Sequence, residues 1–525
     1  MEIRKGSRLR NFHQAKWDEE VIFELNTPGE RGIHIPEVEK EISDVVGDGL
    51  SKIPVAMRRA APPGLPEVGQ MRVLKHFLRL SQQNLGADLN IDIGQGTCTI
   101  KYNPKINEKI AASQKARAIH PHQDVSTVQG ALRVMHEMDL YLREISGMDR
   151  FSLQPSSGSH AILTMASIMH KYHESRGQAE TRDELITTMF SHPSDAAAAA
   201  VKGYKIITIY PDEQGFPDLE ALKAAVSERT AGLFITNPED IGIFNPKIAE
   251  FTRVVHEAGG ICGYDQANAN GILGITRARE ADFDLCFFNL HKTFAAPHGC
   301  GGPGGGALGA TQELADYLPV PLVGLDGDRY FLDYDVPHTI GKVRSFWGPF
   351  PVILKSYAWI LSMGAEGLKE AAHVAVLNNN YLLKKIREID GATSPYTGGK
   401  HRIEQVRYSW EKLYEETGVD THDVTLRLAD FGFHLWQSHH PFVVPQPFTI
   451  EPTESYSKEE LDEYLDGLRH VVREARTEPE TVKRAPHNSV VHRIDDSTLD
   501  DPGKWAVTWR AFLKKHGEAA AKIRD

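Results

Sequence analysis

Between about residue 150 and residue 290, short apolar runs alternate with amphipathic segments. The runs are rich in β-branched and aromatic residues and lie at 185–190, 205–210, 232–236, 261–264 and 285–289. Helical periodicity marks the intervening segments 218–227 and 246–258. Such alternation predicts an α/β fold with a mainly parallel sheet and helices on both faces. Because ligands of these sheets bind beyond the carboxyl ends of the strands, the residues that follow the runs are the functional candidates.

Helix starts are marked by capping patterns. Ser126, with Gln129 three residues on, forms a capping box ahead of a periodic segment that stops at Gly147. Asn245 followed by a proline predicts that the 246–258 helix starts there. Ser457, again with a glutamate three residues on, predicts the start of a long amphipathic helix near the C-terminus.

The chain is expected to have three parts. The first, 1–110, is punctuated by prolines and glycines around a single helical segment near 70–83, so it is predicted to be an extended N-terminal arm. Residues 111–345 contain the alternating pattern and form the large domain. Residues 346–525 are helical and then mixed, which predicts a smaller α+β domain with a helical tail.

Composition removes several classes of function. The 525 residues include 59 Lys and Arg against 71 Asp and Glu, a net charge of −12, which argues against nucleic acid as the main partner. The longest apolar runs fall short of the roughly 18 residues that span a bilayer, and the start lacks the apolar core of a signal peptide, so no membrane association and a cytoplasmic location are expected. The four cysteines form no CxxC pair, so neither a disulfide framework nor a metal site is expected.

The strongest chemical signal lies in 289–294, Asn-Leu-His-Lys-Thr-Phe, which follows an apolar run and precedes a glycine-rich loop. A lysine held in a cleft at a strand end, here Lys292, can form a Schiff base, because burial favours its nucleophilic neutral amine. Asp265 ends the preceding predicted strand, and a carboxylate there can pair with a protonated pyridinium nitrogen. The order of the two residues at successive strand ends predicts a pyridoxal site.

Two further segments suit the same cofactor. The loop 154–159, Gln-Pro-Ser-Ser-Gly-Ser, precedes a predicted helix, where hydroxyl and backbone N–H groups can bind a phosphate. His192 follows the 185–190 run and could stack on a planar ring. Each residue taken alone has a plainer explanation: a surface lysine, a turn aspartate, a helix cap, a structural histidine. Their common order along the chain favours the cofactor site.

Motifs along nearly the whole chain resemble one family. The sequence is similar to the glycine-decarboxylating P-protein of the glycine cleavage system, in particular the second subunit of its two-subunit bacterial form. The matching segments are NLHKTF with PHGCGGPG at 289–304, YDQANANGILG at 264–274, PPGLPEV at 62–68, RLSQQNLG at 79–86, CTIKYNPKINE at 98–108, GDRYFLDYD at 327–335, IEPTES at 450–455 and APHNSVVHRID at 485–495. The resemblance implies a pyridoxal 5'-phosphate (PLP) enzyme of fold type I, with its cofactor in the large domain.

The same resemblance implies roles for single residues. Lys292 is the lysine of the internal aldimine, Asp265 the partner of the ring nitrogen, and His192 the imidazole stacked on the ring. The further cofactor contacts it implies are Ala267, Ser157, Gly158 and His291. The substrate-side candidates are Thr97, Asn270, His298 and His440.

In that family, glycine forms an external aldimine in place of Lys292, loses CO2, and the aminomethyl group passes to the lipoyl arm of the H-protein. The implied partners are therefore a small amino acid, a lipoylated H-protein and a related subunit 1, in a homo- or hetero-oligomer built on a dimer. This chain departs from the family pattern at 192–195, 401–404 and 438–441. Two alternatives therefore stay open: a divergent PLP enzyme acting on another amino acid or amine, by transamination or another Cα-bond cleavage, and a scaffold subunit without activity.

Overall fold

The computed structural model describes residues 9–10, 12, 15–61, 63–86, 90–94, 101–298, 302–396, 401–437, 443–490, 493, 501 and 508–516. The chain divides into two compact units, one of residues 1–10 with 90–485 and one of residues 11–89 with 486–525. Within the described ranges, no helix is long and apolar enough to cross a membrane.

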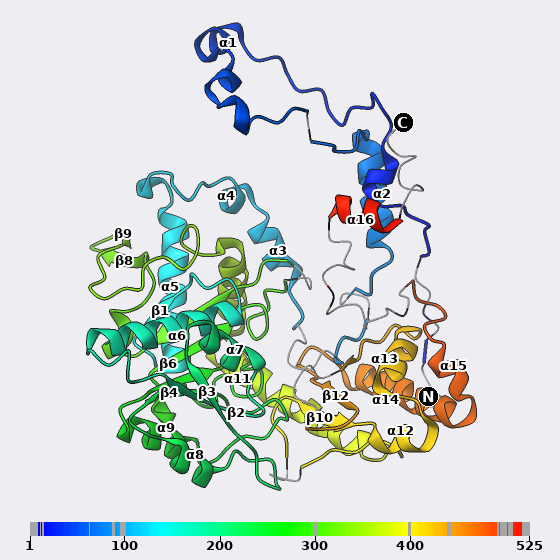
Figure 1. Cartoon of the computed structure of the whole chain (residues 1–525). Helices are drawn as coiled ribbons and strands as arrows, with labels where there is room; N and C mark the ends of the chain where they lie inside the picture. Colours follow the sequence, from blue (N-terminus) through cyan, green and yellow to red (C-terminus); the bar gives the residue numbers. More distant parts are fainter. Residues whose placement is uncertain are drawn as a thin grey trace. The chain divides into compact units, whose positions relative to one another are not determined.

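The larger unit is built on a seven-stranded sheet with the order β1-β7-β6-β5-β4-β2-β3. Strands β1, β6, β4, β2 and β3 of this sheet are labelled in Figure 1. Strands β2 to β6 run parallel to one another, while β7 runs antiparallel to both β6 and β1. The mainly parallel sheet predicted from the apolar runs is confirmed. The strands are β1 (Arg150–Ser152), β2 (Glu184–Thr188), β3 (Lys205–Ile209), β4 (Thr230–Thr236), β5 (Ile261–Asp265), β6 (Leu285–Asn289) and β7 (Gly306–Ala310).

Helices cover both faces of this sheet because the central strands are apolar on both sides. In β4 every residue is buried, and successive side chains alternate between two cores: Leu233 and Ile235 join one, Phe234 the other. The first core is covered by α5 (Gln129–Ser146), α8 (Leu219–Ala225), α9 (Ile248–Glu257) and the start of α11 (Phe350–Ile386), and the second by α6 (Gly158–Ser175), α7 (Pro193–Val201) and α10 (Gln312–Ala315).

Two of the predicted helix starts are wrong. Asp124, not Ser126, caps the short 3-10 turn Val125–Thr127, and the Ser126 hydroxyl donates to Asp124, so α5 begins only at Gln129. Helix α9 begins at Ile248 rather than at residue 246, because Asn245 is engaged with Asn237 in a loop. At Ser126 the hydroxyl that would cap the helix is engaged with Asp124, whereas Oδ1 of Asn245 accepts the backbone N–H of Lys247, which lies ahead of the helix.

The C-terminal half of α11 leads into a second, smaller arrangement of helices and strands in the same unit. Its strands β10 (Val406–Ser409), β12 (Pro447–Ile450) and β11 (Trp436–Gln437) form an antiparallel sheet in that order. Helix α14 (Lys458–Thr477) packs on it and begins at the predicted Ser457 capping box. The remaining helices here are α12 (Glu411–Thr417), α13 (Thr421–Ala429) and α15 (Pro479–Lys483). Elsewhere in the unit lie α3 (Lys105–Ala111), α4 (Gln114–Arg117), the hairpin β8 (Leu322–Asp326) and β9 (Arg329–Asp333), and the 3-10 turn Ala278–Ala281.

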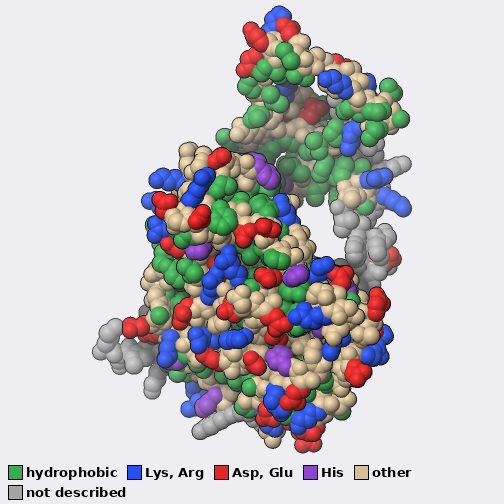
Figure 2. Space-filling view, turned by 90° about the vertical axis from the view of Figure 1, so that its left-hand side faces the viewer, with side chains coloured by type: hydrophobic (Ala, Val, Ile, Leu, Met, Phe, Trp, Pro, Cys, Tyr) green, Lys and Arg blue, Asp and Glu red, His purple; other side chains and the backbone are tan. Residues whose placement is uncertain are grey.

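The smaller unit has little core of its own. It contains α1 (Lys40–Val46), α2 (Gln70–Ser81), α16 (Trp509–His516) and the 3-10 turns Ile22–Leu25, Gly49–Lys52 and Val55–Met57. Its N-terminal and C-terminal segments meet where the ring of Phe23 stacks on that of Trp509, with 4.7 Å between centroids. Many of its large apolar side chains are exposed, and hydrophobic side chains are frequent on its surface (Figure 2).

Candidate functional site

The polar ends of the central strands meet at one cavity. It lies beyond the carboxyl ends of β4, β5 and β6, where parallel α/β sheets bind ligands. The lining residues come from the loops after these strands, from the start of α7 and from the segment before β10: His192, Thr236, Pro238, Asp240, Asp265, Ala267, Asn268, Lys292, Glu404 and Gln405. The structure thus brings four of the predicted site residues onto one cavity, although they are spread over a hundred residues of sequence.

Asp265 is the last residue of β5 and is buried. Its Oδ1 accepts the backbone N–H of Ala267 at 2.8 Å, whereas no described N–H group donates to its Oδ2. Burial raises the pKa of Asp265 to about 6, while the Ala267 hydrogen bond and the charge of Lys292 lower it. The side chain therefore offers a buried, unsatisfied oxygen that a cationic N–H group would satisfy.

Lys292 lies in the turn that follows β6 and is 8% exposed. Its backbone N–H donates to the carbonyl of Asn289 at 3.1 Å, which closes the turn. The next residue, Thr293, accepts the backbone N–H of Ala269 through its hydroxyl at 2.9 Å, so the turns after β5 and β6 are tied together. This link fixes the backbone that carries Lys292 against the loop that carries Asp265.

His192 is the N-cap of α7. Its Nδ1 accepts the backbone N–H of Ser194 at 3.2 Å and lies 2.5 Å from the Ser194 hydroxyl oxygen. The ring is therefore held by its own helix start at the wall of the cavity. Because the cap uses Nδ1, which lies in the plane of the ring, it does not involve the two faces of the imidazole.

The predicted phosphate contacts gather at the start of α6. Ser157 is the N-cap of this helix and accepts the backbone N–H of His160 at 3.3 Å. A Cβ on Gly158 would lie 2.8 Å from the Asn289 amide nitrogen, so the helix start packs directly on the end of β6. His291 is close as well, because a Cβ on Gly304 would approach both its Nδ1 and the Ser156 carbonyl. These residues form one cluster around the α6 N-terminus, where backbone N–H groups favour anions.

His291 is the most strongly shifted histidine of the cluster. Its Nδ1 accepts the backbone N–H of Gly305 at 3.2 Å, and its ring meets the ring of His298 edge to face at 4.8 Å between centroids. Burial, together with the positive charges of Lys292 and His298, lowers the pKa of His291 to about 3. His291 is therefore a neutral imidazole at neutral pH.

Of the four substrate-side candidates, the structure describes two. Asn270 is fully buried and its amide donates to Oε1 of Glu451 at 2.7 Å, so it belongs to a structural hydrogen bond behind the cavity. His298 contacts His291 rather than lining the cavity. Thr97 and His440 lie outside the described residues.

Several acidic residues of the site were missed by sequence reasoning. Asp240 and Glu404 line the cavity, and Glu451 lies behind it, where its Oε1 accepts the amides of both Asn268 and Asn270. Burial raises the pKa of Glu451 to about 7, and burial also raises that of Glu404 well above its usual value. The position of Asp240 shortly after β4 was a usable signal, whereas Glu404 and Glu451 come from the distant C-terminal part.

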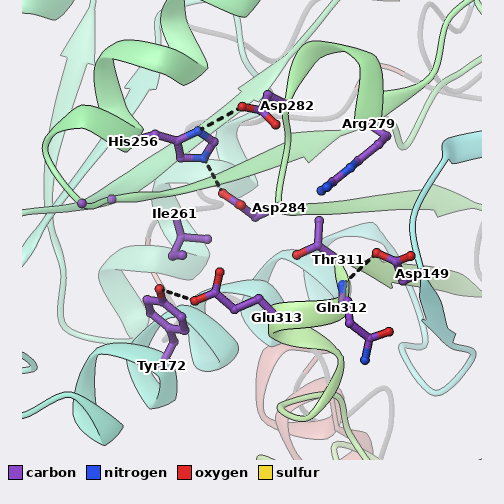
Figure 3. Close-up of a pocket in the computed structure, with 12 residues that line it drawn as sticks. Asp149, Tyr172, His256, Ile261, Arg279, Asp282, Asp284, Thr311, Gln312 and Glu313 are labelled. Carbon is purple, nitrogen blue, oxygen red and sulfur yellow. Dashed lines mark hydrogen bonds and ion pairs between the residues drawn. The ribbon is translucent and has the colours of Figure 1, made fainter.

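A second cavity, of about 400 Å³, opens elsewhere on the large part of the unit and shares no lining residue with the first (Figure 3). Its wall includes His256, whose Nε2 lies 2.8 Å from Oδ2 of Asp284 and whose Nδ1 lies 3.7 Å from Oδ2 of Asp282. The Asp284 hydrogen bond raises the pKa of His256, against the effect of burial. The arrangement is an ion pair that ties α9 to the start of β6.

Family models match two segments of the chain. A model described as "Aminotransferase class-V" matches residues 156–314, and one described as "Glycine dehydrogenase, C-terminal domain" matches residues 371–493. The first segment contains the cavity residues at the strand ends, and the second contains Glu404, Glu451 and the C-terminal sheet.

Curated relatives are similar over nearly the whole chain. A protein of Pyrococcus abyssi named "Probable glycine dehydrogenase (decarboxylating) subunit 2" is 47% identical over 511 residues, which cover 97% of this chain and 99% of that protein. A protein of the same name from Halalkalibacterium halodurans is 41% identical over 483 residues, which cover 92% of this chain and 96% of that one.

Solved structures agree with the fold. A crystal structure titled glycine decarboxylase (P-protein) of the glycine cleavage system, in inhibitor-bound form, superposes with a TM-score of 0.71 at 20% identity over 84% of this chain and all of that one. A NIFS-like protein superposes with a TM-score of 0.57 at 17% identity over 73% of this chain and 99% of that one. The fold-type-I architecture expected from the sequence is confirmed.

Proposed function

Because this chain belongs to the glycine dehydrogenase (decarboxylating) subunit 2 family, we propose that it decarboxylates glycine and passes the aminomethyl group to the lipoyl arm of an H-protein. Pyridoxal 5'-phosphate is the cofactor of this enzyme type. The observation that carries the proposal is the shared cavity of Lys292 and Asp265, two residues delivered by the ends of adjacent strands.

The residues of this chain fit the cofactor. Oδ2 of buried Asp265, to which no described N–H group donates, suits a protonated ring nitrogen, because a buried carboxylate is costly unless a cation pairs with it. The N-terminus of α6, capped by Ser157 and packed through Gly158 against β6, suits the phosphate. His192 and Ala267 also line the cavity and are assigned to the faces of the ring.

When bound, the cofactor accepts the electron pair left on the substrate Cα after loss of CO2. Lys292 would hold the cofactor through its ε-amino group, and the amino group of glycine would take the place of that amine when the substrate binds. Asp265 keeps the proton on the ring nitrogen, which is what makes the ring an electron acceptor. His291, beside the α6 N-terminus, is neutral, so it can form a hydrogen bond to the cofactor without adding a positive charge that would disfavour the protonated ring nitrogen.

The test is exchange of labelled bicarbonate into glycine, measured with and without a lipoylated H-protein. Wild-type protein loaded with cofactor should support the exchange, and Lys292→Ala should lose both the exchange and the visible absorbance of bound cofactor. Lys202→Ala, an exposed lysine at the end of α7, is the matched control and should retain both. Normal absorbance without exchange would reject glycine decarboxylation while leaving the cofactor site intact.

A second candidate function keeps the cofactor and changes the substrate. The cavity wall carries the carboxyl groups of Asp240 and Glu404 besides Asp265, and Asp240 lies 3.7 Å from the guanidinium of buried Arg407. These carboxyl groups can accept hydrogen bonds from the ammonium group of an amine or a basic amino acid, which favours such substrates over a second anion. A panel of amines and amino acids, scored by the change that each produces in the absorbance of bound cofactor, separates this candidate from glycine.

We also propose that the chain works with a related subunit 1, in keeping with the name of its relatives, and that its oligomer is built on a dimer. The proposed working parts are an arm at 1–110, a PLP-binding domain at 111–345 and a C-terminal domain at 346–525. Mass measurement in solution, with the chain alone and with the related subunit, tests the assembly. A chain that stays monomeric in both samples would reject it.

A further inference from the structure

Asp195 is a fully buried acid that the roles above do not use. It lies in the first turn of α7, three residues after His192, and its backbone N–H donates to the His192 carbonyl at 2.9 Å. No N–H or O–H group of the described residues donates to either of its carboxyl oxygens. A carboxylate in such a place would be uncompensated, which costs far more than a neutral carboxyl group.

The group within hydrogen-bond reach of Asp195 is the carboxyl group of Asp265. Two carboxyl groups in contact and removed from water cannot both be ionised, so one of them carries a proton. Asp265 has an N–H donor at 2.8 Å from Ala267 and the charge of Lys292 in front of it, both of which favour its ionised form. Asp195 has neither, so the proton resides on Asp195.

The charges around the pair agree with this assignment. Burial is the main reason why the pKa of Asp195 lies well above its ordinary value, and the charges of Asp265 and Asp240 raise it further. The cation that faces the pair is Lys292, on the side of Asp265. Each of these groups comes from a different element: α7 for Asp195, β5 for Asp265, and the loops after β4 and β6 for Asp240 and Lys292.

We infer that Asp195 is a positioning residue, a neutral carboxyl group whose O–H donates to Asp265 and holds the Asp265 carboxylate toward the ring nitrogen of the cofactor. This inference rests on the proposed cofactor site and names no new reaction. The proton stays on Asp195, so Asp265 keeps its full charge for the ring nitrogen. Because the same turn of α7 carries His192, one hydrogen-bonded turn sets both the stacking residue and the charge partner.

The protonation state can be measured without cofactor. Infrared difference spectra of the cofactor-free protein, wild type minus Asp195→Asn, are recorded at neutral pH. The expected difference is the carbonyl stretch of a protonated carboxyl group, lost in the variant. A difference that instead shows the antisymmetric stretch of a carboxylate would overturn the inference, because Asp195 would then be ionised.

The positioning role is measured on the loaded protein. A side-chain amide can still donate to Asp265, so Asp195→Asn should bind cofactor within about threefold of wild type and keep its absorbance-versus-pH profile. Asp195→Ala removes the donor and should weaken cofactor binding about tenfold or more and displace that profile, since a hydrogen bond to a charged group is lost. Equal behaviour of the two variants would overturn the inference.

Glu239→Gln is the matched control. Glu239 is another fully buried acid, but it accepts from the Thr188 hydroxyl and its variant should bind cofactor like wild type. Neither measurement uses glycine or an H-protein. If the protein passes both tests but exchanges no bicarbonate, the role of Asp195 stands and the proposed decarboxylation is rejected. If it exchanges bicarbonate but fails the two tests, only the role of Asp195 is rejected.

Discussion

The side-chain amide of Asn270 donates a 2.7 Å hydrogen bond to Oε1 of Glu451, and this contact joins the loop after β5 to the segment that follows β12. Asn268 donates to the same oxygen at 2.7 Å, and Asn268 itself lines the cavity. Glu451 is fully buried, so the C-terminal part of the chain fixes the loop that follows Asp265 and carries Ala267. The site therefore depends on a residue that does not itself line the cavity.

Glu451→Ala should destabilise the protein by about 2–4 kcal/mol, because two buried amide groups lose their acceptor. Cofactor should also be lost at a lower temperature than in wild type. Glu451→Gln keeps one oxygen acceptor and should lose less. Thermal melts with and without cofactor measure both effects. If the Ala and Gln variants melt together with wild type, the hydrogen bonds contribute nothing to the loop.

Gly242 connects the loop after β4 to the same C-terminal part. It has φ +76, and a Cβ there would run into the backbone carbonyl of Gln405, which lines the cavity. Gly242→Ala should therefore displace Gln405 and impair cofactor binding, beyond the cost of about 1–2 kcal/mol for a left-handed conformation. Fluorescence titration with cofactor measures this.

Gly177→Ala is the control for Gly242→Ala. Gly177 has φ +69 but a Cβ there would meet nothing within 4 Å, so only the backbone strain remains. This variant should melt slightly lower and bind cofactor normally. Equal losses of cofactor affinity in the two variants would show that strain alone, rather than the Gln405 contact, is responsible.

Local order along the sequence was enough to predict the strand-end residues. Asp265, Lys292 and His192 each lie within three residues of the end of an apolar run, and the parallel sheet then brings such residues to one edge. What the sequence could not specify is the partner of a polar side chain. Asn245 was expected to cap α9, but its backbone N–H donates to Asn237 at 2.8 Å and its Oδ1 accepts from Lys247 at 2.9 Å, so the helix starts later.

The acidic residues of the site show the same limit. Glu404 and Glu451 are separated from Lys292 by more than a hundred residues, and no periodicity links them to the strand ends. Asp195 lies in the first turn of α7, where an acidic residue is common, and no sequence pattern indicates its contact with Asp265. Tertiary packing alone assigns these contacts.

The His256–Asp284 ion pair predicts a pH dependence of stability. The Asp284 hydrogen bond raises the pKa of His256 above its unfolded value of 6.5, so the stabilisation is fully present below that value and is lost as pH rises through the folded-state pKa. Asp284→Asn should therefore lower the melting temperature more at pH 6 than at about pH 9. Asp282→Asn, whose carboxylate lies 3.7 Å from the ring and is exposed, should have a smaller effect. Identical profiles for the two variants would contradict the prediction.

At Glu404 a substitution is expected to raise the stability of the protein, in contrast to the substitutions at Asp284 and Asp282. Burial first, and then the charge of Glu451, raises the pKa of Glu404 well above 4.5, so the neutral acid is the native form. The stability that this form contributes is fully present below about pH 4.5 and is lost as pH rises through the folded-state pKa, because the buried group must then ionise. Glu404→Gln cannot ionise, so in the cofactor-free protein its melting temperature should rise relative to wild type between about pH 5 and about pH 9. Glu228→Gln, at an exposed position before β4, should run parallel to wild type over the same range. A Glu404→Gln curve that also runs parallel would mean that Glu404 is ionised in the native protein, and the acidic cavity wall would then carry one more charge.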